Sequence, residues 1–317
     1  MPSGGKSPNA AIRLEQPGEA VTERGIYKMK IKDILDSRKV MVSCEIFPPR
    51  EDADFERVEH AAKEIACLSP SYISVTYGAS GGTSSHTVDI ASKVQNEWGV
   101  TALAHLTCAS STKEQVEDVI ENLKAHGIEN ILALRGDIPK NADFPLPNQY
   151  RYASELVREI RAQGDFCVGG ACYPEGHVEC EHMADDIGHL KEKVEAGCDF
   201  LTTQMFFDNN VYYNFLYRIL KRDIRVPVIA GIMPVTNGKQ IKRITQLSGT
   251  SLPARFRAIV DKFGDNPKAM KQAGIAYATE QIIDLIANGV TAVHIYSMNK
   301  PDVAGSILHN LSEIIGK

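Results

Sequence analysis

The chain has 317 residues, of which 43% are hydrophobic and 24% charged, and its formal net charge is -5. Because charges of both signs are intermixed without a basic excess, the composition argues against a protein that binds nucleic acid. The apolar runs are far shorter than a bilayer requires, so we expect no membrane-spanning segment and a soluble protein with a small-molecule site.

Residues 1–25 are rich in Gly, Pro, Ser and charged side chains, and they lack the apolar segment of a secretory signal. We expect them to form a flexible N-terminal extension, followed by a single domain over residues 26–317. The seven cysteines are odd in number, scattered and mostly set in apolar stretches. This distribution suits reduced thiols and a cytoplasmic protein.

The first predicted strand carries the most informative side chain. Residues 40–47 alternate between two faces and are rich in β-branched residues, which predicts a strand, and Pro48 and Pro49 end it. Glu45 therefore lies near the carboxyl end of this strand, without a neighbouring base. A carboxylate in apolar surroundings either finds a charged partner or favours its protonated form. Taken alone, Glu45 fits a structural residue paired with an arginine as well as a catalytic one.

Strands and helices alternate along the rest of the chain. After the first strand we expect strands at 72–77, 101–106, 131–134, 166–171, 200–203, 226–230 and 292–296, and helices at 52–68, 86–97, 112–126, 152–163, 183–196, 210–221, 238–247, 253–262, 267–288 and 301–315. Strict alternation implies parallel strands with right-handed crossovers, and eight such units close into a barrel. The predicted fold is an α/β protein, a (β/α)8 TIM barrel with an extra helical segment between strands 7 and 8. The alternative is an open doubly wound sheet, although no Gly-x-Gly-x-x-Gly motif follows a strand.

Polar and aromatic residues follow each predicted strand. In such a barrel the chemistry lies at the carboxyl ends of the strands, so these residues are the candidates for a site. Any single member fits a helix cap or a turn as well, and for Asp208, Thr236 and Asn237 we favour that interpretation. The candidates in chain order are Glu45; Thr76 and Tyr77; His105 and Thr107; Arg135, Gly136 and Asp137; Tyr173, Glu175 and His177; Thr203, Gln204 and Asp208; residues 233–238; and Tyr296, Asn299 and Lys300.

Two of these groups suggest specific ligands. Arg135 offers a planar fork for phosphate, and Gly136 lets the backbone approach a planar ligand, although an ordinary turn with a local ion pair fits as well. Cys172, His177 and Cys180 combine thiol and imidazole ligands, but their spacing does not match a zinc ribbon or finger, and we expect no metal site. A metal-dependent barrel lyase or methyltransferase using these three residues stays as an alternative function.

Eight stretches of the sequence match the pattern of a known family in the same order: Cys44-Glu-Ile-Phe-Pro-Pro-Arg50, Ser74-Val-Thr-Tyr-Gly-Ala79, Ala104-His-Leu-Thr-Cys108, Leu132-Ala-Leu-Arg-Gly-Asp-Ile-Pro139, Ala171-Cys-Tyr-Pro-Glu-Gly-His177, Leu190-Lys-Glu-Lys-Val-Glu-Ala-Gly197, Thr203-Gln-Met-Phe-Phe-Asp208 and Gly231-Ile-Met-Pro-Val235. On these stretches the chain resembles, from about residue 30 to the end, the methylenetetrahydrofolate reductase family, the bacterial type of catalytic flavoprotein barrel. The resemblance implies a single catalytic domain with non-covalent FAD, which a nicotinamide nucleotide reduces. It also implies that 5,10-methylenetetrahydrofolate then becomes 5-methyltetrahydrofolate by ping-pong hydride transfer, a step of one-carbon metabolism and methionine biosynthesis.

Residue roles follow from the same resemblance. Glu45 matches the general acid that protonates N10 of the folate, a role that requires a carboxyl protonated near neutral pH. Asp137 matches the carboxylate beside the flavin pyrimidine edge. Gln204, Gln240 and Lys300 match substrate-binding positions. The positions that match cofactor contacts are Thr76, Tyr77, Ala79, His105, Arg135, Gly136, Asp137, Tyr152, Ala153, Tyr173, His177, Asp186, His189 and Lys193.

Four residues depart from the family pattern. His189 stands where relatives have Asn, Glu192 where they have Arg, Ile244 where an aromatic residue stacks on the substrates, and Lys300 where an Arg meets the glutamyl tail. The direct electron donor therefore stays open between NADH, NADPH and a partner subunit of the kind that supplies electrons to some bacterial relatives. The resemblance also implies a homo-oligomer. A non-catalytic folate or flavin binder within a partner complex is the second alternative function.

Overall fold

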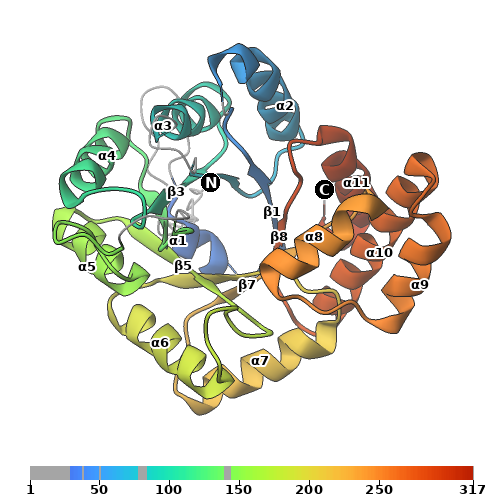
Figure 1. The fold of residues 1–317 in the computed structure, drawn as a ribbon. Helices are drawn as coiled ribbons and strands as arrows, with labels where there is room; N and C mark the ends of the chain where they lie inside the picture. Colours follow the sequence, from blue (N-terminus) through green and yellow to red (C-terminus); the bar gives the residue numbers. More distant parts are fainter. Residues whose placement is uncertain (1–28, 38, 50, 78–83, 139–143, 317) are drawn as a thin grey trace, which may run out of the picture.

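The computed structural model describes residues 29–37, 39–49, 51–77, 84–138 and 144–316. The extension predicted for residues 1–25 lies outside them, and so does Ala79. The described strands form a closed, wholly parallel barrel in which each strand pairs with its neighbours in the sequence and β8 pairs with β1 (Figure 1). The predicted (β/α)8 barrel is confirmed.

The strands are β1 (Met41–Ile46), β2 (Ile73–Val75), β3 (Ala102–Thr107), β4 (Asn130–Leu134), β5 (Cys167–Cys172), β6 (Phe200–Thr203), β7 (Val228–Ile232) and β8 (Ala292–Ile295). The helices are α1 (Ile31–Asp36), α2 (Phe55–Cys67), α3 (Ser84–Ser92), α4 (Lys113–Ala125), α5 (Ala153–Gln163), α6 (Met183–Glu195), α7 (Asn209–Lys221), α8 (Gly238–Ser248), α9 (Ala254–Phe263), α10 (Pro267–Ala287) and α11 (Pro301–Ile315). A short 3-10 turn, η1 (Asp52–Asp54), precedes α2, and a π-helical turn, η2 (Lys93–Glu97), extends α3.

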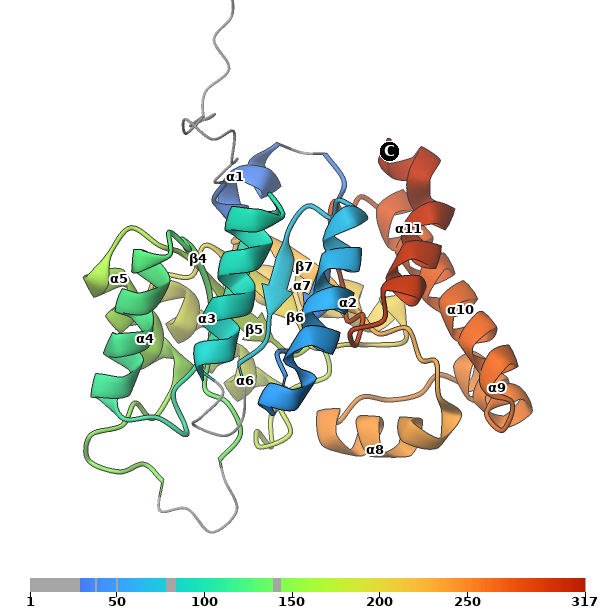
Figure 2. The ribbon, with the colours of Figure 1, turned by 90° about the horizontal axis from the view of Figure 1, so that it is seen from above.

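Most predicted elements agree with the structure to within three residues at each end. The extra helical segment between strands 7 and 8 is present as α8, α9 and α10. Figure 2 shows α8 at the end of the barrel opposite to α1, among the connections that follow the strands. Candidate substrate residues on α8 therefore lie at the carboxyl end of the barrel.

Alternation along β1 decides which side chains enter the barrel. Cys44 and Ile46 pack between the strands and the outer helices, whereas Met41 lies in the apolar cluster inside the barrel. Because successive side chains of a strand point to opposite faces, Ser43 and Glu45 face the interior with Met41. The apolar spacing of β1 thus places a carboxylate inside the barrel, above an apolar layer.

Helix α1 fills the amino end of the barrel and was not predicted, because six residues are too few to show a helical period. Ile31 is fully buried, and its backbone N–H donates to Asn130 Oδ1 at 2.8 Å. The interior cluster that it joins contains Met41, Tyr72, Leu103, Leu132, Cys167, Phe200, Ile229 and Ala292.

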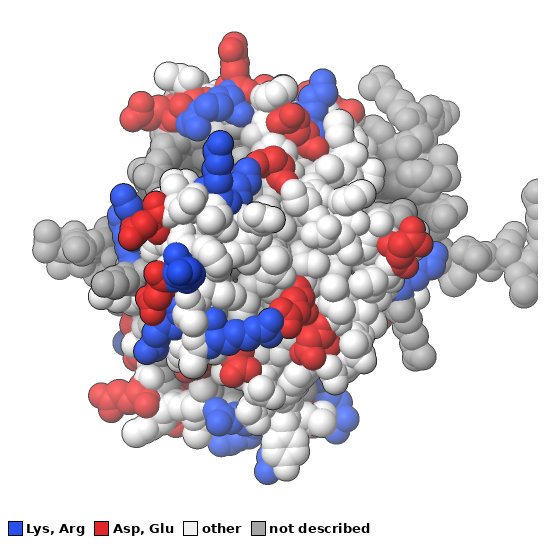
Figure 3. All heavy atoms as spheres, turned by 90° about the vertical axis from the view of Figure 1, so that its right-hand side faces the viewer, with Lys and Arg blue, Asp and Glu red and all other residues white. Residues whose placement is uncertain are grey.

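The surface agrees with the mixed charge composition. On the face that carries the C-terminal helices, described Lys and Arg side chains are interspersed with Asp and Glu side chains (Figure 3). Among the described residues, no helix has the length and apolar character needed to cross a bilayer.

Close backbone packing against α10 gives a prediction about stability. A Cβ atom at Gly274 would overlap the carbonyl oxygen of Val235, on the segment between β7 and α8. Neither backbone can retreat without displacing its element, so we expect Gly274→Ala to lower the free energy of unfolding by about 3 kcal/mol. Gly188→Ala in α6 is the control, because no atom lies within 4 Å of the added Cβ. This variant should gain about 0.5–1 kcal/mol from helix propensity. Urea titrations followed by circular dichroism compare the two, and equal stabilities would contradict the assignment of close packing.

Candidate active site

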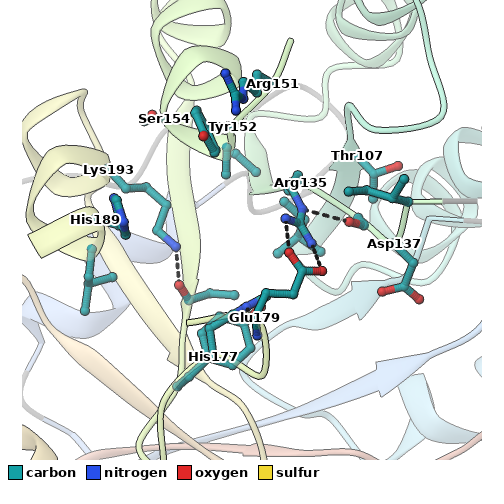
Figure 4. A pocket seen from close by; sticks show the side chains of 18 of the residues that line it. Thr107, Arg135, Asp137, Arg151, Tyr152, Ser154, His177, Glu179, His189 and Lys193 are labelled. Carbon is teal, nitrogen blue, oxygen red and sulfur yellow. Dashed lines mark hydrogen bonds and ion pairs between the residues drawn. The ribbon is translucent and has the colours of Figure 1, made fainter. Parts of the chain in front are cut away.

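A cavity of about 850 Å³ opens at the carboxyl ends of β2 to β5, a size near the top of the range of about 300–1,000 Å³ for ligand pockets. Its walls include the first turn of α5 and one face of α6 (Figure 4). The candidate cofactor residues that line it are Thr76, Tyr77, His105, Arg135, Gly136, Asp137, Tyr152, Ala153, Tyr173, His177, Asp186, His189 and Lys193.

Glu45 lies beside this cavity, inside the barrel. Its side chain is 8% exposed, and its Oε2 lies 3.7 Å from His105 Nε2 and 3.9 Å from His294 Nε2. His105 lines the cavity and connects it to the carboxyl group. No base is adjacent to Glu45 along the sequence, but the closed barrel brings two imidazoles to it, one from β3 and one from β8.

His105 is an uncharged neighbour at neutral pH. Burial lowers the pKa of His105 to about 4, although the Glu45 carboxyl acts in the opposite direction. Within the described residues, its buried Nε2 has no hydrogen-bond partner. The carboxyl group of Glu45 therefore faces a neutral ring whose nitrogen is available to a third group.

His294 was not recognised in the sequence. The register pairs it with Ser43 across the seam of the barrel, and Ser43 Oγ lies 2.7 Å from His294 Nδ1. Ser74 Oγ lies 3.2 Å from Nε2, so hydroxyl groups flank both nitrogens. The ring also stacks on Tyr72, with centroids 5.7 Å apart. These contacts fix the ring plane behind Glu45. The sequence signal that could have identified it is its position two residues after Ala292, because residues two apart on a strand face the same side and Ala292 faces the interior.

The phosphate interpretation expected the guanidinium of Arg135 to be free for a ligand, but in the structure it is paired. Its Nη1 and Nη2 donate to the two carboxylate oxygens of Glu179 at 2.6 and 2.7 Å, and its Nε donates to the carbonyl of Gly136 at 3.3 Å (Figure 4). Glu179 belongs to the connection between β5 and α6 and was not a sequence candidate. The same connection is held at a second point, where Glu175 accepts a hydrogen bond from the Ser251 N–H at 3.0 Å.

Gly136 and Asp137 continue the wall beyond Arg135. Gly136 has a φ of +81°, and a Cβ there would lie 2.9 Å from Thr107 Cβ, so both conformation and space require glycine. Asp137 follows at the rim of the cavity, where its side chain is exposed.

The face of α6 combines the predicted trio Asp186, His189 and Lys193 with Glu192. Lys193 is half-buried, and its Nζ donates a hydrogen bond to the carbonyl of Ala171 (Figure 4). Burial lowers the pKa of the Lys193 ammonium and raises the pKa of Asp186. This wall therefore carries both donors and acceptors, as a ligand with hydroxyl and ring-nitrogen groups requires.

The candidate substrate residues lie outside this cavity. Gln204 follows β6 and is half-buried, whereas Gln240 is exposed on α8. Lys300 precedes α11, and its Nζ donates to Thr236 Oγ1 at 2.7 Å. All three belong to elements after β6, so they lie on the part of the barrel mouth across from the walls built by β2 to β5.

The residues of the metal alternative are not arranged as a ligand set. Burial raises the pKa of the Cys172 thiol, and Cys180 Sγ donates to the carbonyl of His182 at 3.4 Å. In the described part of the chain, no three His, Cys, Asp or Glu side chains are grouped to hold a metal ion.

The comparisons with known proteins agree on one family. The profile of the family described as methylenetetrahydrofolate reductase matches residues 30–312. Methylenetetrahydrofolate reductase (NADH) 1 of Arabidopsis thaliana is 34% identical over 298 residues, which cover 90% of this chain and 50% of the plant protein. The chain thus spans about half the length of the plant relatives.

A bacterial relative matches over most of both chains. The 5,10-methylenetetrahydrofolate reductase of Escherichia coli K12 is 33% identical over 273 residues, which cover 86% of this chain and 91% of that protein. A solved structure from Clostridium thermocellum, described as an uncharacterized protein that binds two copies of 5-methyl-5,6,7,8-tetrahydrofolic acid, shares the fold with a TM-score of 0.61 and 14% identity, covering 91% of this chain and 99% of its own. On the family profile and these relatives, the chain belongs to the methylenetetrahydrofolate reductase family.

Proposed function

We propose that this protein reduces 5,10-methylenetetrahydrofolate to 5-methyltetrahydrofolate with FAD as its cofactor, in two successive hydride transfers. The observation that carries the proposal is Glu45, a buried carboxyl group whose Oε2 lies 3.7 Å from Nε2 of His105, which lines the cavity that gathers the flavin-matching residues. Family membership supports the reductase activity, and the site geometry supports the assignment of roles.

The cavity fits FAD in its chemistry. The first turn of α5 lines it with Ala153 and Ser154, and Tyr152, the N-cap residue, provides no side-chain cap. Backbone N–H groups at a helix start favour phosphate. The polar face of α6 suits ribityl or ribose hydroxyls. Bound there, the flavin would accept a hydride from the electron donor and deliver it to the folate.

Glu45 is proposed as the general acid for N10 of the folate. Protonation of N10 opens the bridging ring and leaves a reactive iminium at N5. The neutral His105 ring lies beside the carboxyl group of Glu45, and the contact of His294 with Ser43 holds the second ring behind it. Gln204 and Gln240 have the paired donor and acceptor needed for a pterin edge, and Lys300 provides a cation for the glutamyl carboxylate.

A nicotinamide nucleotide is the proposed electron donor. The plant relatives are named as NADH enzymes, which favours NADH over NADPH and over a partner subunit. Reduction trials with each nucleotide, and with a low-potential donor, separate these sources. We also propose that the protein is a homo-oligomer, because the family resemblance implies one. Sedimentation of the purified protein would test this.

Separate half-reactions test the proposed function. The protein should bind FAD, lose its yellow colour with NADH without oxygen, and recover it with methylenetetrahydrofolate. Glu45→Gln should keep the first step and slow the second by about 10²–10⁴-fold, because only folate reduction needs the proton. Stopped-flow absorbance of the flavin measures both steps, with Glu280→Gln as a surface control. A protein that takes up no FAD, or a Glu45→Gln variant with a wild-type second step, would contradict the proposal.

Asp137 is proposed to act through its charge on the flavin. Two unit charges 4 Å apart interact by about 1 kcal/mol in water and more when they are buried, and Asp137 is exposed. Asp137→Asn should therefore raise the flavin reduction potential and slow hydride transfer to folate by about fivefold. Redox titration against a reference dye measures the potential. An unchanged potential would show that the charge does not reach the ring.

The pKa of His105 predicts a loss of stability in acid. Because the folded-state pKa is about 4 and the unfolded value is about 6.5, the folded protein favours the neutral ring. This contribution, of about 3 kcal/mol, is fully present above pH 6.5 and is lost as the pH falls from 6.5 toward 4. His105→Gln should lose less stability than the wild type between pH 7 and pH 4.5, in urea titrations of flavin-free protein. The exposed His309→Gln control should behave as the wild type, and identical losses in all three proteins would exclude His105 as the source.

A further inference from the structure

The cavity that we assign to the cofactor contains an ion pair whose role the proposed function does not explain. Arg135 and Glu179 form a bidentate pair, with both nitrogen–oxygen distances below 2.8 Å. Arg135 follows β4 and Glu179 lies between β5 and α6, so the pair joins two walls of the same cavity. Figure 4 shows Glu179 between Arg135 and His177, facing the lined space.

The guanidinium of Arg135 is largely committed to the protein. Its Nε–H donates to the carbonyl of Gly136, and one N–H of each terminal nitrogen donates to the carboxylate of Glu179. A guanidinium has five N–H donors, so two remain, and its charge is offset by the adjacent carboxylate. Arg135 therefore cannot offer a bidentate, uncompensated fork to phosphate while Glu179 holds it.

The other cations of the cavity do not replace it. Lys193 is half-buried, and its Nζ donates to the carbonyl of Ala171. Arg151 is exposed, with its guanidinium 5.2 Å from the centroid of the Tyr152 ring. The described lining residues include more acidic side chains than Lys or Arg side chains. The acids are Asp137, Glu179, Asp186 and Glu192, and the cations are Arg135, Arg151 and Lys193. A ligand with two phosphate charges gains most if the carboxylate nearest to Arg135 gives way.

Glu179 is placed to give way. Its side chain is 54% exposed, against 22% for Arg135. Exposed ion pairs are worth about 0.2–1 kcal/mol, and the Glu179 carboxylate is on the exposed side of this pair, so water can solvate it after release. Glu179 also sits on a turn, in which its backbone N–H donates to His177 Nδ1 at 3.2 Å and the N–H of Cys180 donates to the carbonyl of His177 at 2.9 Å. Its side chain can rotate away without moving a strand or helix.

We propose that Glu179 competes with the phosphate groups of the cofactor for the guanidinium of Arg135, and so sets how tightly the cavity holds phosphate-bearing ligands. The inference rests on the proposed function for the identity of the ligand. The proposal predicts that Glu179 lowers the affinity of the cavity for phosphate-bearing ligands. Its carboxylate must leave Arg135 before a phosphate can accept hydrogen bonds from both Nη1 and Nη2. A residue that only oriented Arg135 would have the opposite effect.

Flavins of graded phosphate content test the competition. Glu179→Gln and Glu179→Ala should bind FAD and FMN two- to fivefold more tightly than the wild type, which is the fold-change for about 0.5–1 kcal/mol. Riboflavin, which has no phosphate, should bind equally to all three proteins. Quenching of flavin fluorescence measures each dissociation constant. The gain should vanish when Glu179→Gln is combined with Arg135→Gln.

A matched control exists on the far side of the barrel. Arg255 and Glu280 form a similar bidentate, exposed pair between α9 and α10, away from the cavity. Glu280→Gln should leave the affinity for every flavin unchanged. Weaker FAD binding by Glu179→Gln, or an equal gain for riboflavin, would overturn the proposal, as would the same gain in the Arg135→Gln background.

A second ligand separates this inference from the proposed function. If the wild-type protein bound no flavin, the proposed function would fail, but the competition could still be measured with ADP and inorganic pyrophosphate by calorimetry. Tighter binding of both by Glu179→Gln would support the competition in that case. Unchanged binding of both would overturn it.

Discussion

Closure of eight parallel strands is the constraint on which the rest of this structure depends. Because side chains alternate along a strand, closure directs every second residue of every strand into one shared interior. The layer near the amino end is apolar and includes Met41 and Phe200, and the layer above it holds Ser43, Glu45 and His294. Burial of a carboxyl group beside imidazole rings is thus a result of strand register, and not of a specialised loop.

The mouth of the barrel consists of two parts that follow the order of the chain. The ends of β2 to β5, with α5 and α6, supply the residues that suit a phosphate-bearing cofactor, whereas the elements after β6 supply Gln204, Gln240 and Lys300. The connection between β5 and α6 reaches both sides, through Glu179 to Arg135 and through Glu175 to Ser251. One short segment therefore contacts both halves of the barrel mouth.

The sequence was sufficient to predict the barrel, because strand and helix periods repeat strongly and Pro48 and Pro49 mark the end of the first strand. It also identified part of the cavity wall, because Thr76, His105 and Arg135 each lie at the carboxyl end of a predicted strand, whereas the wall residues on α5 and α6 came from the family resemblance. It did not reveal α1, which is too short to show a period, or His294, whose role depends on a seam between the first and last strands. Glu179 was missed because an acidic residue in a polar connection has no local signal until its partner, Arg135, is seen 2.6 Å away.

Helix α1 has a consequence for access to the interior of the barrel. Ile31 and the apolar side chains around it fill the amino end, so the described residues leave no path to Glu45 from that side. A ligand of the cavity approaches Glu45 from the carboxyl ends of the strands. In the function that we propose, nucleotide and folate would both arrive from that end, and binding one after the other suits two successive hydride transfers.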